Sequence, residues 1–494
     1  MIDINKLLNL LRYDPNDPVL FNSAFFLYYF AVFLMCYLAV HRSKAGRVWV
    51  YTLFSLFFFY KACGYYVGLV ILSAIVDFNL SRWIHRTPKR STKTTLLVFS
   101  IILNIGLLFY FKYTNFFIGI INDFAAGNIP LLKLTLPIGI SFYTFENLSY
   151  TIDVYRDELE PVDNFMDYLF FLSFFPKLMM GPIVRAHDFI PQISKPYFID
   201  SEDIGKGMYL IISGLFKKII ISDFIYQNFV QYIFDDPSKH TGLECLLGVY
   251  GYAMVIYCDF SGYSDMALGI ARWTGFKIPP NFDSPYQSSS ITEFWRRWHI
   301  SLSSWLRDYL YIPLGGNRKG KVRQYINLGL TMLIGGFWHG ASWNFIFWGG
   351  MHGSMLAIDK VRIDYLKKRN ITFGGWKGKF LKVLGILFTF HFVCFCWIFF
   401  KASTFHDAWA LIHQIAYDFQ PEIWKELYTG YTAVFWVMLM GFVLHFMPKK
   451  AELSMEGAYA RIPVVGSVAV MVAFVWLLVQ VKSTQPMIPI YFQF

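Results

Sequence analysis

Residues 19–40 read VLFNSAFFLYYFAVFLMCYLAV and are followed directly by the basic stretch HRSKAGR, residues 41–47. An apolar segment of about 20 residues can cross the hydrocarbon core of a bilayer as a helix. Short loops rich in Lys and Arg stay in the cytoplasm. Further apolar segments occur at residues 95–111, 134–155 and 383–400. We therefore expect a membrane protein whose first basic loop is cytoplasmic.

The composition of the whole chain agrees with lipid as its solvent. Of 494 residues, 56% are hydrophobic and 16% are charged, whereas soluble domains carry about 25% charged residues. We expect an all-α polytopic membrane protein in which residues 1–494 form a single domain. Counting apolar segments between basic loops predicts roughly eleven crossings, together with short or re-entrant helices.

The charge pattern argues against nucleic acid as a partner. The net charge is +11, but the Lys and Arg residues gather between apolar segments, where they set membrane topology. The six cysteines lie mostly within or beside apolar runs, which is typical of packing residues. No metal-ligand spacing is visible, so we expect no metal and no bound cofactor.

A short hairpin around His339 is the first candidate for chemistry. Residues 325–338 and 344–358 are apolar, and each is only about 14 residues, or about 20 Å as a helix, which is short of the roughly 30 Å core. Both are flanked by basic loops, at residues 318–323 and after Lys360. The pair should enter and leave on the same side, with its apex inside the membrane. An imidazole there can act as a base shielded from water.

A second histidine lies in the stretch that begins at Trp295. Continued as a helix with 3.6 residues per turn, this stretch places His299 on one face with Trp295 and Leu302, and it places Arg296 and Arg307 on another. One interpretation is an interfacial helix anchored by tryptophans. The other is that the buried face presents a second imidazole to the core, while the arginines meet phosphate groups in the cytoplasm.

Three stretches resemble a known family. They are WRRWHISLS (residues 295–303), WLRDYLYIPLGGNR (305–318) and GFWHGA (336–341). Together they resemble the membrane-bound O-acyltransferases. Flanking stretches extend the resemblance over about residues 136–353: LPIGISFYTF (136–145), DVYR (153–156), GPIVR (181–185), FIPQ (189–192) and DFSGYSD (259–265).

The resemblance implies a helical bundle around a central catalytic channel, with His339 as the catalytic histidine and His299 as the second active-site position. It is closest to the bacterial branch that contains alginate O-acetyltransferases and D-alanine exporters of teichoic acid. One departure is Glu146, where the family pattern leads us to expect Gln.

The expected function follows from the family. We expect an acetyl group to pass from a cytosolic thioester, acetyl-CoA, to a hydroxyl outside the cell, in a bacterial inner membrane. The acceptor would be a polysaccharide or a serine of an esterase-like partner protein. The phosphates of the donor would meet arginines at the cytoplasmic mouth: Arg296, Arg297, Arg307 and Arg318.

Other functions remain open at this point. A related enzyme could transfer D-alanine or acylate lipids or proteins. A transporter would use His339, Glu146 and Asp153 as a proton path, although no internal repeat is visible.

Several other polar residues allow a chemical interpretation, but we favour a structural one. Asp259, Ser261 and Asp265 could include a nucleophile, yet DFSGYSD is typical of a helix break with capping hydroxyls. Asp283 and Glu293 could form a pair of acids, and for them too we favour a structural role. Gly315-Gly316-Asn317 predicts a turn rather than a phosphate loop, because no strand precedes it.

Overall fold

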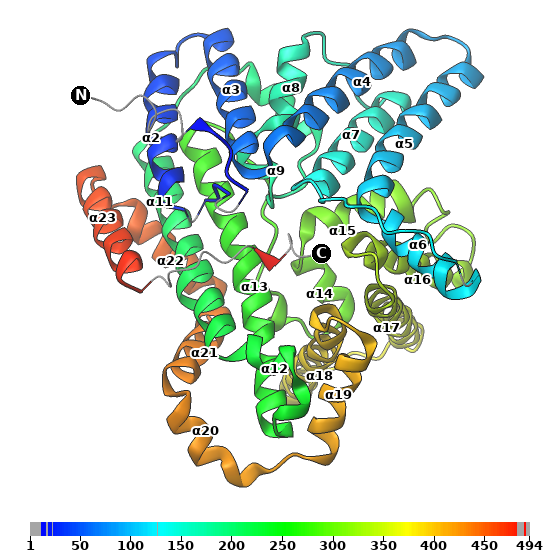
Figure 1. Cartoon of the computed structure of the whole chain (residues 1–494), viewed down its shortest axis with the longest axis vertical. Helices are drawn as coiled ribbons and strands as arrows, with labels where there is room; N and C mark the ends of the chain where they lie inside the picture. Colours follow the sequence, from blue (N-terminus) through cyan, green and yellow to red (C-terminus); the bar gives the residue numbers. More distant parts are fainter. Residues whose placement is uncertain (1–10, 16–17, 22, 126, 482–488, 491–494) are drawn as a thin grey trace. The chain divides into compact units, whose positions relative to one another are not determined.

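The computed structural model describes residues 11–15, 18–21, 23–125, 127–481 and 489–490. These residues form helices joined by loops, and no strand occurs among them (Figure 1). The predicted all-helical class is therefore confirmed. The chain divides into two compact units, Met1–Gly207 with Met266–Pro279, and Met208–Asp265 with Pro280–Phe494. The single domain expected from the sequence stays a prediction.

The first unit is built mainly from the N-terminal helices. Serine side chains begin two of them: Ser23 accepts the N–H of Phe26, and Ser43 accepts the N–H of Gly46. The helices are α2 (Ala24–Ala39), α3 (Lys44–Cys63), the 3₁₀ turn η1 (Gly64–Tyr66), α4 (Val67–Arg86), α5 (Arg90–Lys112), α6 (Thr114–Ala125), α7 (Ile140–Tyr155), α8 (Phe165–Ser173), α9 (Phe175–Leu178) and α10 (Ala186–Ile193).

A buried carboxylate joins the helices α4, α5 and α7, which pack on one another (Figure 1). Asp77 of α4 is 1% exposed and accepts hydrogen bonds from Ser100 at 2.6 Å and Asn104 at 2.8 Å, both on α5. Thr151 of α7 adds a third at 3.4 Å. Because a buried polar group is costly without partners, these donors explain how the carboxylate is kept inside an apolar bundle.

The second unit contains the stretches that resemble the acyltransferases around His299 and His339. Its elements include three π-helical turns, η2, η3 and η6. Helices α11 (Ser201–Leu215) and α13 (Gly242–Trp273) run from one unit into the other, and the remaining elements are η2 (Phe216–Asp223), η3 (Tyr226–Val230), α12 (Gln231–Asp235), η4 (Pro237–Lys239), η5 (Pro285–Gln287), α14 (Ile291–Arg297), α15 (Ile300–Leu306), η6 (Arg307–Tyr311), α16 (Lys321–His339), α17 (Trp343–Lys368), α18 (Gly375–Lys401), α19 (Phe405–Tyr417), η7 (Pro421–Ile423), α20 (Trp424–Gly430), α21 (Thr432–His445), α22 (Lys449–Ala460) and α23 (Val464–Val481).

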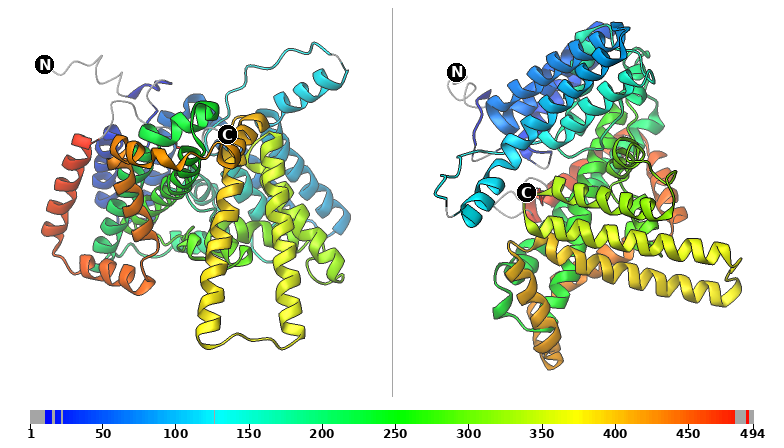
Figure 2. Two further views of the ribbon diagram at one scale, coloured as in Figure 1. Left: turned by 90° about the horizontal axis from the view of Figure 1, so that it is seen from below. Right: turned by 90° about the vertical axis from the view of Figure 1, so that its right-hand side faces the viewer.

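Helices α16 and α17 form the hairpin that was predicted around His339. Glycines allow the two backbones to touch: a Cβ on Gly336 would lie 2.4 Å from the carbonyl oxygen of Phe345, and one on Gly349 would lie 2.4 Å from that of Met332. Small residues at such a crossing are typical of membrane helix pairs. Helix α17 then runs beside α18, to which the turn 369–374 connects it (Figure 2, left).

The hairpin differs from the prediction in its length. The apolar runs are short, but the helices continue into polar residues at the ends away from the apex. At 1.5 Å per residue, the 19 residues of α16 span about 28 Å. Neither α16 nor α17 is among the helical stretches that are long and apolar enough to cross a membrane, so the expectation that neither arm crosses on its own stays a prediction.

Fewer membrane crossings can be identified in the structure than the sequence suggested. In the described part of the chain, four helical stretches are long and apolar enough to cross a membrane: Lys44–Arg86, Arg90–Lys112, Gly242–Trp273 and Gly375–Lys401. Two bent helix pairs would raise this number to six. The count of eleven is not confirmed, because many of the other helices are short or carry polar residues.

Candidate active site

His339 is the last residue of α16 and lies at the apex of the hairpin. Its side chain is buried, and its ring packs against three aromatic residues: Trp338 at a centroid distance of 4.9 Å, Trp348 at 5.2 Å and Phe400 at 5.4 Å. Trp348 belongs to α17 and Phe400 to α18. Three consecutive helices therefore fix the position of this imidazole within an apolar shell.

His299 does not continue a helix, contrary to the prediction. Helix α14 ends at Arg297, α15 begins at Ile300, and His299 between them has a left-handed backbone with φ 45° and ψ 55°. That conformation is uncommon for a residue other than glycine and is often found at functional sites. His299 is nevertheless fully buried, as predicted, with its ring 4.7 Å from that of Phe260.

The helix breaks at His299 because a preceding segment takes over its hydrogen bonds. The N–H of Ile300 donates to the carbonyl oxygen of Asn281 at 2.9 Å, and the N–H of Asp283 donates to the carbonyl oxygen of Arg297 at 3.0 Å. The buried Asn281 side chain also accepts bonds from the hydroxyl of Ser301 at 2.7 Å and from its N–H at 3.3 Å. Asn281 thus caps α15 and holds the turn that carries His299.

The ring of Trp338 packs against both histidines. The ring of Trp338 lies 6.4 Å from that of His299 and 4.9 Å from that of His339. The two imidazoles are therefore at most about 11 Å apart, with both distances measured between ring centroids. An upper limit of this size is compatible with a shared active site, and the assignment of both histidines to one site stays a prediction.

Burial also fixes the charge of His299. The residue lies outside the stretches that could span the membrane, and burial lowers its pKa to about 3. The imidazole is therefore neutral at physiological pH, so it can donate or accept a hydrogen bond but carries no charge.

A cavity of about 270 Å³ lies beside α14 and contains two of the four predicted arginines, Arg296 and Arg307. Lys360 adds a third cation, which the sequence did not suggest. The rest of the wall contains both apolar side chains and polar ones, namely those of two threonines, a serine, a glutamine and a tyrosine. The lining residues are Thr292, Trp295, Arg296, Ser303, Leu306, Arg307, Tyr311, Gln324, Leu328, Thr331, Met332, Leu356 and Lys360.

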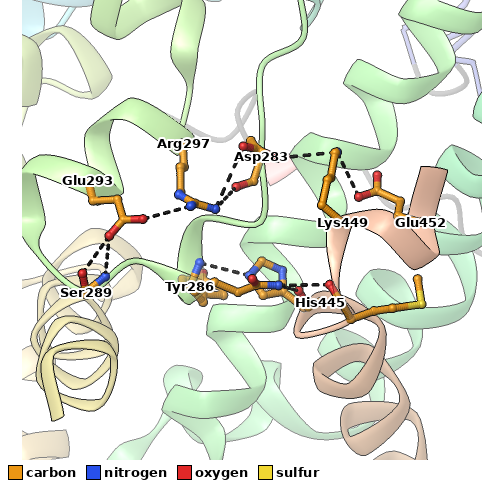
Figure 3. Close-up of polar contacts among 10 residues, drawn as sticks. Asp283, Tyr286, Ser289, Glu293, Arg297, His445, Lys449 and Glu452 are labelled. Atoms are coloured by element: carbon orange, nitrogen blue, oxygen red, sulfur yellow. Dashed lines mark hydrogen bonds and ion pairs between the residues drawn. The ribbon is translucent and has the colours of Figure 1, made fainter. Parts of the chain in front are cut away.

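The other two predicted arginines do not line this cavity. Arg318 is exposed in the turn after η6, where Gly315 and Gly316 have positive φ angles; the predicted turn is confirmed. Arg297 pairs with Glu293 at 2.9 Å and donates to the carbonyl oxygen of Asp283 at 3.2 Å (Figure 3). Both residues lie on the segment that carries His299, so Arg297 helps to hold that segment.

The C-terminal helices contact the same segment. Lys449 of α22 lies 3.5 Å from Asp283, and the N–H of Tyr286 donates to Nε2 of His445 at 3.0 Å (Figure 3). Ser289 donates to Glu293 through both its N–H and its hydroxyl, each at 2.9 Å. Asp283 and Glu293 are therefore engaged in ion pairs of the fold, as the structural interpretation expected.

The DFSGYSD stretch is not a helix break, and that prediction was wrong. Helix α13 runs through it without interruption. Its two aspartates bind lysines of η2, with Asp259 at 2.5 Å from Lys218 and Asp265 at 2.6 Å from Lys217. The carboxylates join two helices, which agrees with the structural role preferred for them.

Glu146 also has a partner that the sequence pattern did not reveal. In the first unit its carboxylate binds the buried Lys177 and accepts the N–H of Val184 at 3.1 Å. The carboxylate that stands here in place of the expected Gln therefore forms an ion pair with a buried lysine.

The part of the chain that matches known proteins includes both His299 and His339. The family model described as MBOAT, membrane-bound O-acyltransferase family, matches residues 156–405. A peptidoglycan O-acetyltransferase of Helicobacter pylori is 35% identical over 79% of this chain and 78% of its own. A probable alginate O-acetylase AlgI of Azotobacter vinelandii is 39% identical over 74% and 68%. A teichoic acid D-alanyltransferase of Bacillus subtilis is 30% identical over 54% and 69%.

Proposed function

Because the chain belongs to the membrane-bound O-acyltransferase family, we propose that it transfers an acetyl group from acetyl-CoA in the cytosol to a hydroxyl of a cell-surface or exported polysaccharide. The named activities of its more similar relatives, peptidoglycan O-acetylation and alginate O-acetylation, support this substrate class. The observation that carries the proposal is that His339 and His299 are both buried and that both rings pack against Trp338.

His339 is the general base of the proposed reaction. It accepts the proton of the acceptor hydroxyl as the hydroxyl oxygen attacks the thioester carbonyl carbon. The tetrahedral intermediate then collapses, the carbon–sulfur bond breaks, and the proton passes to the leaving thiolate. His299 stays neutral and orients the acceptor or donates a hydrogen bond to the developing oxyanion. Because both rings lie in an apolar shell, bulk water is kept from hydrolysing the thioester.

The cavity beside α14 is the proposed donor site. Arg296, Arg307 and Lys360 supply the positive charge that the phosphates of CoA need, and the apolar side chains among the lining residues suit a thioester arm. Arg297 is better assigned to holding the His299 segment, and Arg318 lies in an exposed turn outside the cavity lining. The acceptor reaches His339 from the opposite side of the membrane, either as polymer or through a serine of an esterase-like partner protein.

Purified protein in liposomes can test the donor and the histidines together. Acetyl-CoA and a D-alanyl carrier thioester are supplied separately, and label on a polysaccharide acceptor is measured. We expect transfer from acetyl-CoA and a loss of about 10²-fold or more in His339→Ala, with a smaller loss in His299→Ala. His406→Ala changes an exposed histidine of α19 and should keep full activity.

Transfer from the D-alanyl thioester alone would favour the D-alanyltransferase function of the Bacillus relative. Near-normal transfer by a folded His339→Ala protein would overturn the assignment of the base.

A further inference from the structure

Trp295 connects the proposed donor cavity to His339 through one intervening ring, that of Trp348. Its side chain is 8% exposed and lines the cavity. Its ring lies 5.8 Å from that of Trp348, and the ring of Trp348 lies 5.2 Å from that of His339. Neither Trp348 nor His339 lines the cavity. The indole of Trp295 therefore lies on the series of ring contacts that leads from the cavity to His339.

A buried histidine fixes the position of this indole. The Nε1–H of Trp295 donates to Nδ1 of His352 at 3.2 Å, and the two rings meet nearly at right angles, with centroids 5.2 Å apart. An indole nitrogen can only donate, so Nδ1 of His352 must be unprotonated and its proton must sit on Nε2.

The rest of the His352 environment is apolar, which makes a histidine costly at this position. The side chain is fully buried, and its Nε2 has no hydrogen-bond partner among the described residues. Its ring packs against Trp348 at 4.6 Å and Phe392 at 5.6 Å. Because a buried polar atom without a partner is unfavourable, a phenylalanine would suit the packing better. What an imidazole adds is the acceptor for Trp295.

From these contacts, and resting on the proposed function, we propose that Trp295 restricts the donor to short acyl groups and that His352 is the positioning residue that holds it. An acetyl group passes the indole, whereas a longer chain collides with a ring that is fixed on one side by His352 and on another by Trp348. Specificity for acetyl transfer is then set at the exit of the donor cavity.

The test is the profile of donors from acetyl-CoA to butyryl-CoA and hexanoyl-CoA, measured as kcat/KM for the full-length protein in liposomes. We expect Trp295→Ala to raise hexanoyl relative to acetyl transfer by at least about tenfold, the scale on which an apolar wall discriminates methylene groups. Trp295→Phe keeps most of the ring and should change the profile less. Trp343→Ala removes an exposed tryptophan of α17 and should leave the profile unchanged.

Variants of His352 separate positioning from packing. His352→Asn retains an acceptor and should keep the preference for acetyl-CoA, whereas His352→Leu should shift the profile in the same direction as Trp295→Ala. In Trp295→Phe, which has no N–H, the change from His352 to Leu should have little further effect on the profile.

An unchanged donor profile in folded, active Trp295→Ala protein would overturn the inference while leaving acetyl transfer intact. Wild-type protein that transfers no acyl group from any CoA donor would instead overturn the proposed function.

Discussion

Replacing Glu146 by Gln should destabilise the protein strongly, although Gln is the residue that the family pattern led us to expect. Glu146 and Lys177 are both almost completely buried and form an ion pair. The amide oxygen of Gln can still accept the N–H of Val184, which lies 3.1 Å from the carboxylate. The substitution therefore removes the negative charge and leaves the hydrogen bond, so that Lys177 becomes a buried cation without its carboxylate.

Leaving one member of a buried ion pair without the other costs about 3–5 kcal/mol. The ammonium of Lys177 also lies 4.0 Å from the ring centroid of Phe171, but this contact is present in both proteins and does not change the difference between them. We therefore expect a loss of about 3–5 kcal/mol. Thermal unfolding in detergent, followed by the loss of the monodisperse peak in size-exclusion chromatography, measures the change.

The double variant Glu146→Gln/Lys177→Met supplies the matched control. It removes both charges and keeps an unbranched side chain of similar length, so its stability should return to within about 1 kcal/mol of wild type. A Glu146→Gln protein as stable as wild type, or a double variant no better than the single one, would refute the account of this pair.

Three further predictions concern the second unit. Asn281→Leu removes both hydrogen bonds from Ser301 and should cost about 2–4 kcal/mol of stability. It should also lower kcat more than it raises KM. Asn281→Asp keeps the acceptor, so equal activity of the two variants would contradict the capping role. Gly349→Ala places a Cβ 2.4 Å from a carbonyl oxygen of α16 and should lower the unfolding temperature, whereas at Gly350 the nearest atom is the end of a leucine side chain at 3.6 Å and alanine should be tolerated. Burial lowers the pKa of His299 to about 3, below the value of about 6.5 in the unfolded chain. The contribution of the neutral imidazole to stability is therefore complete above pH 6.5 and is lost as the pH falls from there toward 3. The unfolding temperature should fall less between pH 7.5 and 5.5 in His299→Asn than in wild type.

The sequence predicted those features that depend on local pattern and composition. Apolar segments separated by basic loops indicated membrane helices, and two adjacent apolar runs indicated the α16–α17 hairpin with His339 at its apex. The burial of His299 also followed from its neighbours, even though the helix expected there does not exist. The prediction of burial came from the spacing of Trp295, His299 and Leu302. All three side chains are buried in the structure, although the helix between them is interrupted.

Features that depend on contacts between distant residues could not be predicted in this way. The break at His299 is made by Asn281, which no helical periodicity relates to it. The arginines were equivalent in the sequence, but Glu293 and Asp283 bind Arg297. Arg296 and Arg307 line the cavity, where Arg307 also pairs with Asp308 at 2.7 Å. Lys360 was seen only as part of a basic loop.

Two further misses have the same physical cause. His352 has the same kind of apolar surroundings in the sequence as several other histidines, and only its contact with Trp295 distinguishes it. Glu146 stood out as a departure from a motif, but its partner Lys177 lies on another helix. A charged residue inside an apolar bundle indicates that a partner exists without indicating where it is.

The most direct test of the central claim is acetyl transfer across a sealed bilayer. Oriented proteoliposomes receive labelled acetyl-CoA only on the face that carries the basic loops, and polysaccharide only on the other face. We predict that label accumulates on the polysaccharide with wild-type protein and falls by about 10²-fold or more with His339→Ala. Equal labelling by the two proteins, or labelling only when donor and acceptor share one face, would contradict acyl transfer through a membrane-embedded His339.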